Sequence, residues 1–292
     1  MTQEPPGSSD QVVDETAETF CYGHPDTPTK LRCSRCNRPI CGRCAIPASV
    51  GQHCPECVAE ARRSAPRVRT AMAANAPVIL GIIAATVGFF VFQQLSLGQL
   101  TRSFASCPGA IADGEWWRLI TPVLVHANFI HIGMNMLVLY VYGMNVEQVF
   151  GSGRFLLIYV ISGLTGSAFS FAFGSGAPSV GASGAVFGVV GALVVYLYRR
   201  RSSQFISQHL SGIMGFLVLN AVIGFILPQV DVLAHLGGLA GGAALGFAFD
   251  RGGRGAETTS PPGIQVAGVL ATSAVVLALV AWKSSTSFVA FC

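Results

Sequence analysis

The chain has 292 residues, of which 51% are hydrophobic and only 11% are charged, and its formal net charge is +4. Soluble domains carry roughly 25% charged residues, so this composition excludes an ordinary soluble enzyme and indicates a membrane protein. The charged residues concentrate in the first 70 positions. The remainder divides into apolar runs of about 17 to 22 residues, a length that spans a bilayer.

The amino-terminal segment predicts a small metal-binding domain. Residues 1–19 hold five acidic residues and no basic one, so we expect a disordered acidic tail. Residues 20–58 contain four pairs of Cys or His residues, each pair separated by two positions, so one backbone turn can present two metal ligands. The pairs are Cys21 and His24, Cys33 and Cys36, Cys41 and Cys44, and Cys54 and Cys57.

These eight ligands suffice for two tetrahedral zinc ions, and the segment is too short and polar to be held together by an apolar core. If the pairs alternate, the first and third bind one ion and the second and fourth bind the other. His53 could replace Cys54. A disulfide framework is the alternative, but it needs an oxidising compartment. Because protein fills every position, these zinc ions would be structural, and none is expected to serve catalysis.

Seven apolar runs predict an all-α polytopic membrane protein, preceded by a linker at 59–76. A proline and polar residues at 228–231 separate the fifth run from the sixth, and one longer helix is the alternative to a tight turn there. The runs lie at 77–95, 127–146, 155–173, 182–198, 212–228, 232–250 and 264–282.

Basic residues predict the orientation. Arginines before the first run, after the fourth (Arg199 to Arg201) and after the sixth all fall on one side if the spans alternate. Basic loops stay in the cytoplasm, so we expect a cytoplasmic amino terminus, a cytoplasmic loop at 251–263 and an external tail at 283–292. Cys107 and Cys292 would both be external, where a disulfide is possible. The basic linker could bind anionic lipid or nucleic acid, but a topology signal explains it, and no nucleic-acid partner is expected.

Two reactive side chains interrupt the apolar runs. A charged group near the membrane centre costs roughly 2.5 kcal/mol or more, so Ser183 and His235 suggest function. The alternating topology places both residues just inside the external face. His131 and Asn135 are four residues apart, share a face of the second span and project to the same depth. We therefore expect these four side chains to converge.

Glycines support this convergence. On the sixth span, Gly238, Gly242 and Gly246 lie near the His235 direction, and the fourth span carries a similar stripe that begins at Gly184. Faces without side chains let helices approach closely. The two stripes could therefore bring Ser183 and His235 within hydrogen-bond reach.

A serine beside a histidine predicts hydrolysis. The hydroxyl is a poor nucleophile at neutral pH, and a histidine with a pKa of about 6.5 can take its proton and return it to a leaving amine. The oxyanion needs hydrogen-bond donors. The backbone N–H of Ser183, at an unsatisfied helix start, is one candidate, and the side chains of His131 and Asn135 are the others.

At these residues the chain resembles the rhomboid family of intramembrane serine proteases, over roughly 77–250. The motifs are Trp117-Arg118 in the first external loop, His131-x3-Asn135, Gly181-x-Ser183-Gly184, and His235 followed by Gly238 and Gly242. The resemblance implies a six-helix core with the run at 264–282 as a seventh helix. It also implies a dyad of Ser183 and His235 without a third acid, His131 and Asn135 as oxyanion partners, and a structural role for Trp117-Arg118.

The resemblance extends to one ring beside the dyad and to the metal-binding segment. Many family members have a tyrosine four residues after the nucleophile, stacked on the histidine, and Phe187 keeps that ring without its hydroxyl. Residues 20–58 resemble a B-box-type zinc finger, which implies a binding module with an unknown cytosolic partner. Asp231, one turn before His235, is expected to cap a helix. His126 is expected to be an ordinary interface residue, although it could line a water path.

The expected function is cleavage of transmembrane proteins near the external face of the cell membrane. The alternative is an inactive membrane adaptor that binds transmembrane segments and recruits partners through its zinc finger. A protease whose zinc-binding or redox-sensitive head regulates the membrane domain is compatible with the first function.

Overall fold

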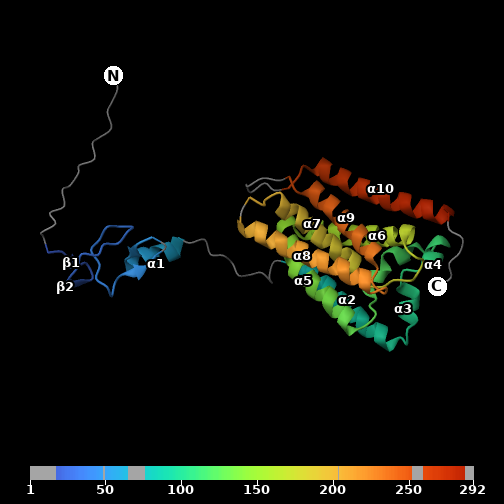
Figure 1. Cartoon of the computed structure of the whole chain (residues 1–292), viewed down its shortest axis with the longest axis horizontal. Coiled ribbons are helices and arrows are strands. Elements are labelled where there is room, and N and C mark those ends of the chain that lie inside the picture. Colours follow the sequence, from blue (N-terminus) through green and yellow to red (C-terminus); the bar gives the residue numbers. More distant parts are fainter. Residues whose placement is uncertain (1–17, 49, 65–75, 203, 252–258, 287–292) are drawn as a thin grey trace, which may run out of the picture. The chain divides into compact units, whose positions relative to one another are not determined.

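The computed structural model describes residues 18–48, 50–64, 76–202, 204–251 and 259–286 (Figure 1). The chain divides into two compact units, Met1–Thr70 and Ala71–Cys292. The expected acidic tail, except its last two residues, and most of the linker lie outside the described residues, as do Cys292 and most of the external tail.

The first unit contains two short hairpins and one helix. Strand β1 (Phe20–Cys21) pairs antiparallel with β2 (His24–Pro28), and β3 (Ile46–Pro47) pairs with β4 (Gln52–His53). Helix α1 (Pro55–Ser64) follows and occupies the first part of the expected linker. The buried cluster of this unit consists of six cysteines and Ile40. One apolar side chain provides little hydrophobic stabilisation, so this fold depends on its cysteines.

The second unit is a bundle of apolar helices, which confirms the expected all-α polytopic membrane fold. Among the described residues, six helices are long and apolar enough to cross a membrane, and α7 is a shorter apolar helix. The helices are α2 (Pro77–Leu95), α5 (Phe129–Phe150), α6 (Ser152–Phe173), α7 (Ser183–Tyr198), α8 (Gln204–Ile226), α9 (Val232–Phe249) and α10 (Pro262–Thr286).

The boundaries of α8 and α9 bear on two sequence expectations. Helices α8 and α9 are separate, joined by a turn at 227–231, so the single longer helix is wrong. Helix α8 begins at Gln204 rather than at 212, because the polar residues of its first turns lie outside the apolar run but still adopt helical geometry. His209 lies on this helix.

Helix α7 occupies the centre of the bundle, where every residue from Gly184 to Leu193 is buried. It packs against α5, α6 and α9, and α10 lies along α6 and α9 at the edge of the bundle (Figure 1). The functional residues expected on α7 are thus held by neighbours on several sides.

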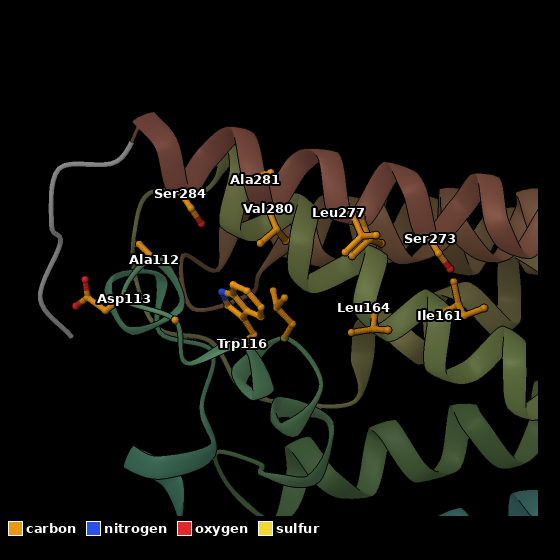
Figure 2. Close-up of a pocket in the computed structure, with 13 residues that line it drawn as sticks. Ala112, Asp113, Trp116, Ile161, Leu164, Ser273, Leu277, Val280, Ala281 and Ser284 are labelled. Carbon is orange, nitrogen blue, oxygen red and sulfur yellow. The ribbon is translucent and has the colours of Figure 1, made fainter.

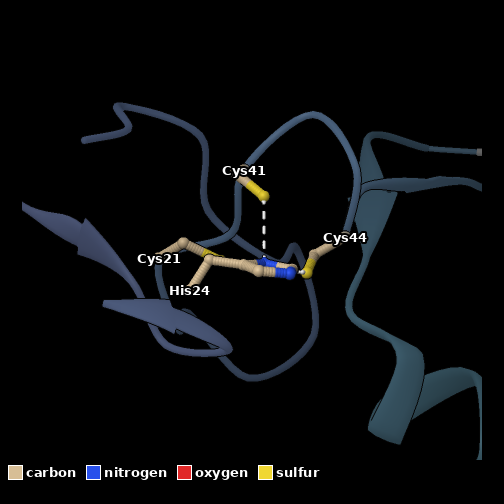
Figure 3. A group of neighbouring side chains, drawn as sticks. All are labelled: Cys21, His24, Cys41 and Cys44. Atoms are coloured by element: carbon tan, nitrogen blue, oxygen red, sulfur yellow. Dashed lines mark hydrogen bonds between the residues drawn. The ribbon is translucent and has the colours of Figure 1, made fainter. Parts of the chain in front are cut away.

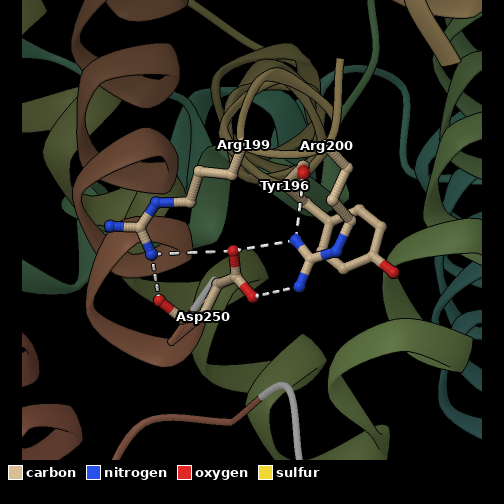
Figure 4. A network of polar contacts seen from close by, with 4 residues as sticks. All are labelled: Tyr196, Arg199, Arg200 and Asp250. Atoms are coloured by element: carbon tan, nitrogen blue, oxygen red, sulfur yellow. Dashed lines mark hydrogen bonds and ion pairs between the residues drawn. The ribbon is translucent and has the colours of Figure 1, made fainter. Parts of the chain in front are cut away.

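A buried ion-pair network joins the ends of α7 and α9 (Figure 4). The Asp250 side chain is 1% exposed, and its two oxygens accept hydrogen bonds of 2.8 and 2.9 Å from Arg200. Arg199 adds an ion pair at 3.6 Å, and the Arg200 guanidinium lies 3.9 Å from the centre of the Tyr196 ring. Because the carboxylate is fully paired, its burial is tolerated.

Between α2 and α5, the chain forms four short helical segments that the hydrophobicity pattern did not predict. Arg118 holds this loop together by donating hydrogen bonds to the carbonyls of Arg102 at 2.7 Å and Ala105 at 2.9 Å, and it pairs with Glu115. Trp117 is 53% exposed. The segments are α3 (Gln99–Phe104), α4 (Pro108–Ala112), η1 (Trp116–Leu119) and η2 (Thr121–Leu124).

Candidate active site and metal centres

Helices α7 and α9 contact each other backbone to backbone. A Cβ atom on Gly238 would lie 1.9 Å from the carbonyl oxygen of Gly184, and one on Gly242 would lie 1.9 Å from that of Gly188. No real Cβ contact is that short, so larger residues at Gly238 or Gly242 would force the helices apart. The close approach expected from the two glycine stripes is confirmed.

Phe187 and His235 face each other across this contact. Their rings are stacked, with centroids 4.1 Å apart and planes inclined by 8°. Phe187 is buried, whereas His235 is half-buried. The stacking expected at position 187 is therefore present without a tyrosine hydroxyl, and it restrains the imidazole on the face of α9 that meets α7.

Ser183 is the first residue of α7, and the segment before it has a restricted conformation. Gly181 has φ +121°, a region that side chains disfavour, and a Cβ atom there would lie 2.6 Å from the His131 ring. Its N–H donates to the carbonyl of Pro122 at 2.9 Å. Glycine at 181 thus lets the backbone pass directly beside the His131 imidazole on its way to Ser183.

His131 and Asn135 lie on α5, on the side that faces this segment. The Asn128 side chain caps the helix by accepting from the His131 N–H at 2.9 Å. His131 Nδ1 accepts from the Ala127 N–H at 3.4 Å, which assigns the proton of the neutral ring to Nε2. The buried Asn135 amide donates one hydrogen to the carbonyl of His131 at 2.9 Å and keeps a second one.

Among the described residues, no hydrogen bond joins Ser183 to His235. Catalytic hydrogen bonds are often long in structures without substrate and shorten only in the reacting complex. The structure thus places Ser183 and His235 on two helices that contact each other. The hydrogen-bonded catalytic dyad of these two residues stays a prediction.

His126 belongs to the same group of residues, although sequence reasoning treated it as ordinary. Its side chain is fully buried, and its Nε2 accepts from the N–H of Ala182 at 3.3 Å. Its ring lies edge-on to His131, with centroids 5.1 Å apart. No periodic pattern could reveal this contact, because it joins a loop before α5 to the residue before Ser183.

Asp231 caps α9, as the sequence predicted. Its Oδ1 accepts from the N–H of Ala234 at 2.9 Å, and its Oδ2 accepts from the Ser170 hydroxyl at 2.5 Å. Both carboxylate oxygens are engaged with groups other than the His235 ring. The capping function explains this acid without a triad.

Two groups of side chains in the first unit could each hold a metal ion. The first consists of Cys21, His24, Cys41 and Cys44, with His24 Nδ1 at 3.3 Å from the Cys44 sulfur and 3.4 Å from the Cys41 sulfur (Figure 3). Sulfur ligands at 2.3 Å from a tetrahedral zinc ion would be about 3.8 Å apart, and nitrogen ligands somewhat closer. The Cys21–Cys44 sulfur distance is 3.8 Å, so the group fits such an ion.

The second group confirms the alternating arrangement of the pairs. In each group the ligand atoms lie within 4.8 Å of one another, and Cys54 rather than His53 takes part. The sulfurs of Cys36 and Cys54 are 3.7 Å apart. The members of the second group are Cys33, Cys36, Cys54 and Cys57.

The thiols of these groups differ in acidity. Burial raises the pKa of Cys21, but hydrogen bonds from the Cys41 backbone and the His24 side chain outweigh it and lower the pKa to about 6. Burial and neighbouring thiols raise the pKa of Cys44 to about 11. At neutral pH the Cys21 thiolate is therefore available, and an incoming cation would release the proton of Cys44.

The disulfide considered between Cys107 and Cys292 falls partly outside the described residues. Cys107 is disulfide-bonded, and Cys292 is not described. The seven cysteines of the first unit are free, so the disulfide framework considered for that unit is wrong.

Comparison with known proteins points to one family. Residues 113–251 match the model of the rhomboid domain. The chain is 46% identical over 141 residues to rhomboid protease GluP of Bacillus subtilis, a match that covers 47% of this chain and 27% of that protein. It is 42% identical over 140 residues to mitochondrial RHOMBOID-like protein 6 of Arabidopsis thaliana, covering 47% of this chain and 45% of that protein.

The chain thus spans less than half the length of these two relatives. Its match to the putative rhomboid protease YdcA of Bacillus subtilis is 33% identical over 175 residues and covers 59% of this chain and 87% of that protein. The candidate residues on α5, α7 and α9 all fall within the stretch that matches the domain. The chain belongs to the rhomboid family.

Proposed function

We propose that the chain is an intramembrane serine endopeptidase in which Ser183 is the nucleophile and His235 is the general base and acid. The observation that carries this proposal is the stack of Phe187 on His235 at the backbone contact between α7 and α9. It holds an imidazole beside the first turn of the helix that Ser183 begins. The names of two matched relatives from Bacillus subtilis, one a rhomboid protease and the other a putative rhomboid protease, support the same reaction class.

The proposed reaction follows from the donors and acceptors of the site. His235 takes the hydroxyl proton while Ser183 Oγ attacks the peptide carbonyl, and the C–N bond then breaks as His235 returns the proton to the leaving nitrogen. Water, activated by the same ring, hydrolyses the acyl-enzyme. The Ser183 N–H, His131 Nε2–H and the second hydrogen of the Asn135 amide would stabilise the oxyanion.

The length of α7 supports a site below the membrane surface. Its 16 residues extend about 24 Å, less than the roughly 30 Å of a hydrocarbon core. With the arginines after Tyr198 at one surface, Ser183 would begin inside the opposite leaflet. Positive charges predict that this is the external leaflet, with the amino terminus in the cytoplasm.

The substrates we propose are transmembrane proteins cleaved near their external ends. A helix hides its carbonyls in hydrogen bonds, so the scissile segment must unwind before Ser183 can attack. Small or helix-breaking residues at that point lower the cost of unwinding. Cleavage should therefore concentrate where such residues lie at the depth of Ser183.

For the first unit we propose a structural, B-box-like module that holds two zinc ions. Thiolate-rich tetrahedral groups favour zinc, and with four protein ligands each ion would lack an open position for water. The module would bind a cytosolic partner and take no part in peptide hydrolysis. The ligands of the two groups alternate along this short segment, and each group is made of protein side chains alone. This arrangement supports a structural and binding role.

Cleavage of a co-expressed single-span substrate tests the catalytic proposal. Ser183→Ala should lower cleavage by about 10⁴-fold or more, since the nucleophile is lost while the helix contact is kept. Ser211→Ala is the matched control, because Ser211 is exposed and its hydroxyl only bonds the carbonyl of Ser207 within α8. The wild type and this control should also react with a fluorophosphonate, whereas Ser183→Ala should not. A folded wild type that neither cleaves nor labels would favour the inactive adaptor.

A further inference from the structure

A cavity lies between α10 and the rest of the bundle, and none of its lining residues belongs to the candidate active site. The cavity measures about 660 Å³ and is lined by residues of α4, η1, α6 and α10 (Figure 2). Small-molecule sites have volumes of roughly 300 to 1,000 Å³, so this cavity is large enough for a ligand. The proposed reaction does not use it.

The cavity is elongated and mostly apolar. On α10 it extends from Ser273 to Ser284, about 16 Å of helix, and Ile161 and Leu164 of α6 form the facing wall (Figure 2). In a membrane, surrounding lipid is the only abundant apolar molecule. The lining therefore suits a hydrocarbon chain along the direction of the helices.

One end of the cavity is polar. Asp113, Trp116 and Ser284 lie there, whereas Ile161 and Ser273 lie at the opposite end (Figure 2). The Ser284 hydroxyl is buried and has no hydrogen-bond partner among the described residues. A buried hydroxyl without a partner is costly, so an acceptor supplied by a ligand would stabilise it. Trp116 and the neighbouring Lys283 are residue types that mark the membrane–water interface.

We propose that this cavity binds one acyl chain of a membrane phospholipid, with the ester carbonyl of that chain accepting a hydrogen bond from Ser284. The chain lies between α6 and α10, and the head group lies at the polar end near Asp113 and Trp116. A phospholipid acyl chain suits both parts of the cavity, because its hydrocarbon tail fits the apolar lining and its ester carbonyl accepts the hydrogen bond of Ser284.

A substrate helix, about 10 Å across, is the other apolar occupant to consider for this space. An acyl chain is far thinner and can follow the wall formed by α6. The proposal is also independent of catalysis, because none of the lining residues belongs to the candidate active site.

Photo-crosslinking tests the proposal with the full chain in vesicles of phosphatidylethanolamine and phosphatidylglycerol. The probe is a phosphatidylethanolamine with a diazirine on one acyl chain. Adducts should concentrate on the cavity-facing residues of α6 and α10. Leu277→Trp should reduce them to the level found on lipid-facing residues of α8, because the larger side chain fills the cavity.

Leu270→Trp is the matched control. Leu270 lies two turns earlier on the same face of α10, and the residue is 63% exposed, compared with 70% for Leu277, but it does not line the cavity. It should leave the adducts unchanged. Ser284→Ala, a small change that should not disturb folding, should reduce the lipid retained through detergent washing in native mass spectrometry.

Three outcomes would overturn the proposal. Adducts spread evenly over all lipid-facing helices would mean that lipid does not occupy the cavity, and so would equal yields for Leu277→Trp and Leu270→Trp. In the Ser183→Ala background, a single-span substrate should not compete with the probe. Competition between substrate and probe in this background would assign the cavity to the substrate. The loss of cleavage caused by Ser183→Ala should not change the adducts, because the proposed lipid site does not use Ser183.

Discussion

Each unit of this chain is stabilised internally by a different kind of interaction. In the first unit, six cysteines and Ile40 form the buried cluster, and seven cysteines and His24 form two groups that fit metal ions. In the second unit, glycines remove side chains between α7 and α9 until the backbones meet. We therefore expect the first unit to depend on bound metal ions, whereas the second depends on the fit of its own helices.

Metal removal should produce the largest difference in stability between the two units. A strong chelator should unfold residues 20–57, because structural zinc contributes an apparent binding free energy of about 10 to 16 kcal/mol in zinc-finger peptides. The helical bundle and its cleavage activity should persist, since no proposed catalytic residue belongs to either metal group. Hydrogen exchange of the full chain in detergent would show both effects.

Added zinc is the control for this experiment and should restore protection of the first unit. Protection that survives complete metal removal would contradict the proposed metal dependence. Loss of cleavage on chelation that returns with zinc would instead show that the first unit regulates the second.

The sequence predicted these two modes of stabilisation to different extents. Metal-ligand pairs at fixed spacing predicted eight ligands for two ions, whereas the alternating arrangement and the choice of Cys54 over His53 came from the structure. The glycine stripes predicted the contact of α7 with α9, because helical periodicity relates residues such as Gly238 and Gly242 on one face. Periodicity describes one element at a time, and it therefore predicts contacts best where two regular faces meet.

The features that the sequence did not predict lie in irregular segments or join side chains that are distant along the chain. His126 reaches the N–H of Ala182 from a loop. Asp250, at the end of α9, pairs with arginines that served only as a topology signal in the sequence. The cavity beside α10 depends on the loop helices after α3, whose sequence carries no apolar run.

Breaking the buried ion-pair network should destabilise the second unit alone. Asp250→Asn leaves Arg199 and Arg200 without a counter-charge, and removal of one partner from a buried pair costs about 3 to 5 kcal/mol. The melting temperature of the bundle in detergent should fall, while the metal content of the first unit should stay the same.

Arg201→Gln provides the comparison within the same run of arginines. Arg201 is exposed and bonds the carbonyl of Tyr198 in its own turn, so its loss should change stability by no more than about 1 kcal/mol. Equal effects of the two substitutions would show that Asp250 is solvated rather than buried in the membrane-bound protein.

A methyl group between α7 and α9 should have a smaller but more informative effect. In Gly242→Ala the new Cβ atom would meet the carbonyl oxygen of Gly188, so the helices must separate, and overpacking of this kind costs about 1 to 3 kcal/mol. Gly88→Ala on α2 is the matched control, because nothing lies within 4 Å of its Cβ position. It should raise stability slightly, since alanine favours helices by about 1 kcal/mol over glycine.

The two substitutions should differ in activity as well as in melting temperature. Separation of α7 from α9 would move His235 away from Ser183, so Gly242→Ala should lose more cleavage than its loss of stability explains when both proteins are assayed well below their melting temperatures. Gly88→Ala should cleave at the wild-type rate. A Gly242→Ala protein that is destabilised but fully active would show that the backbone contact supports the fold without positioning the proposed dyad.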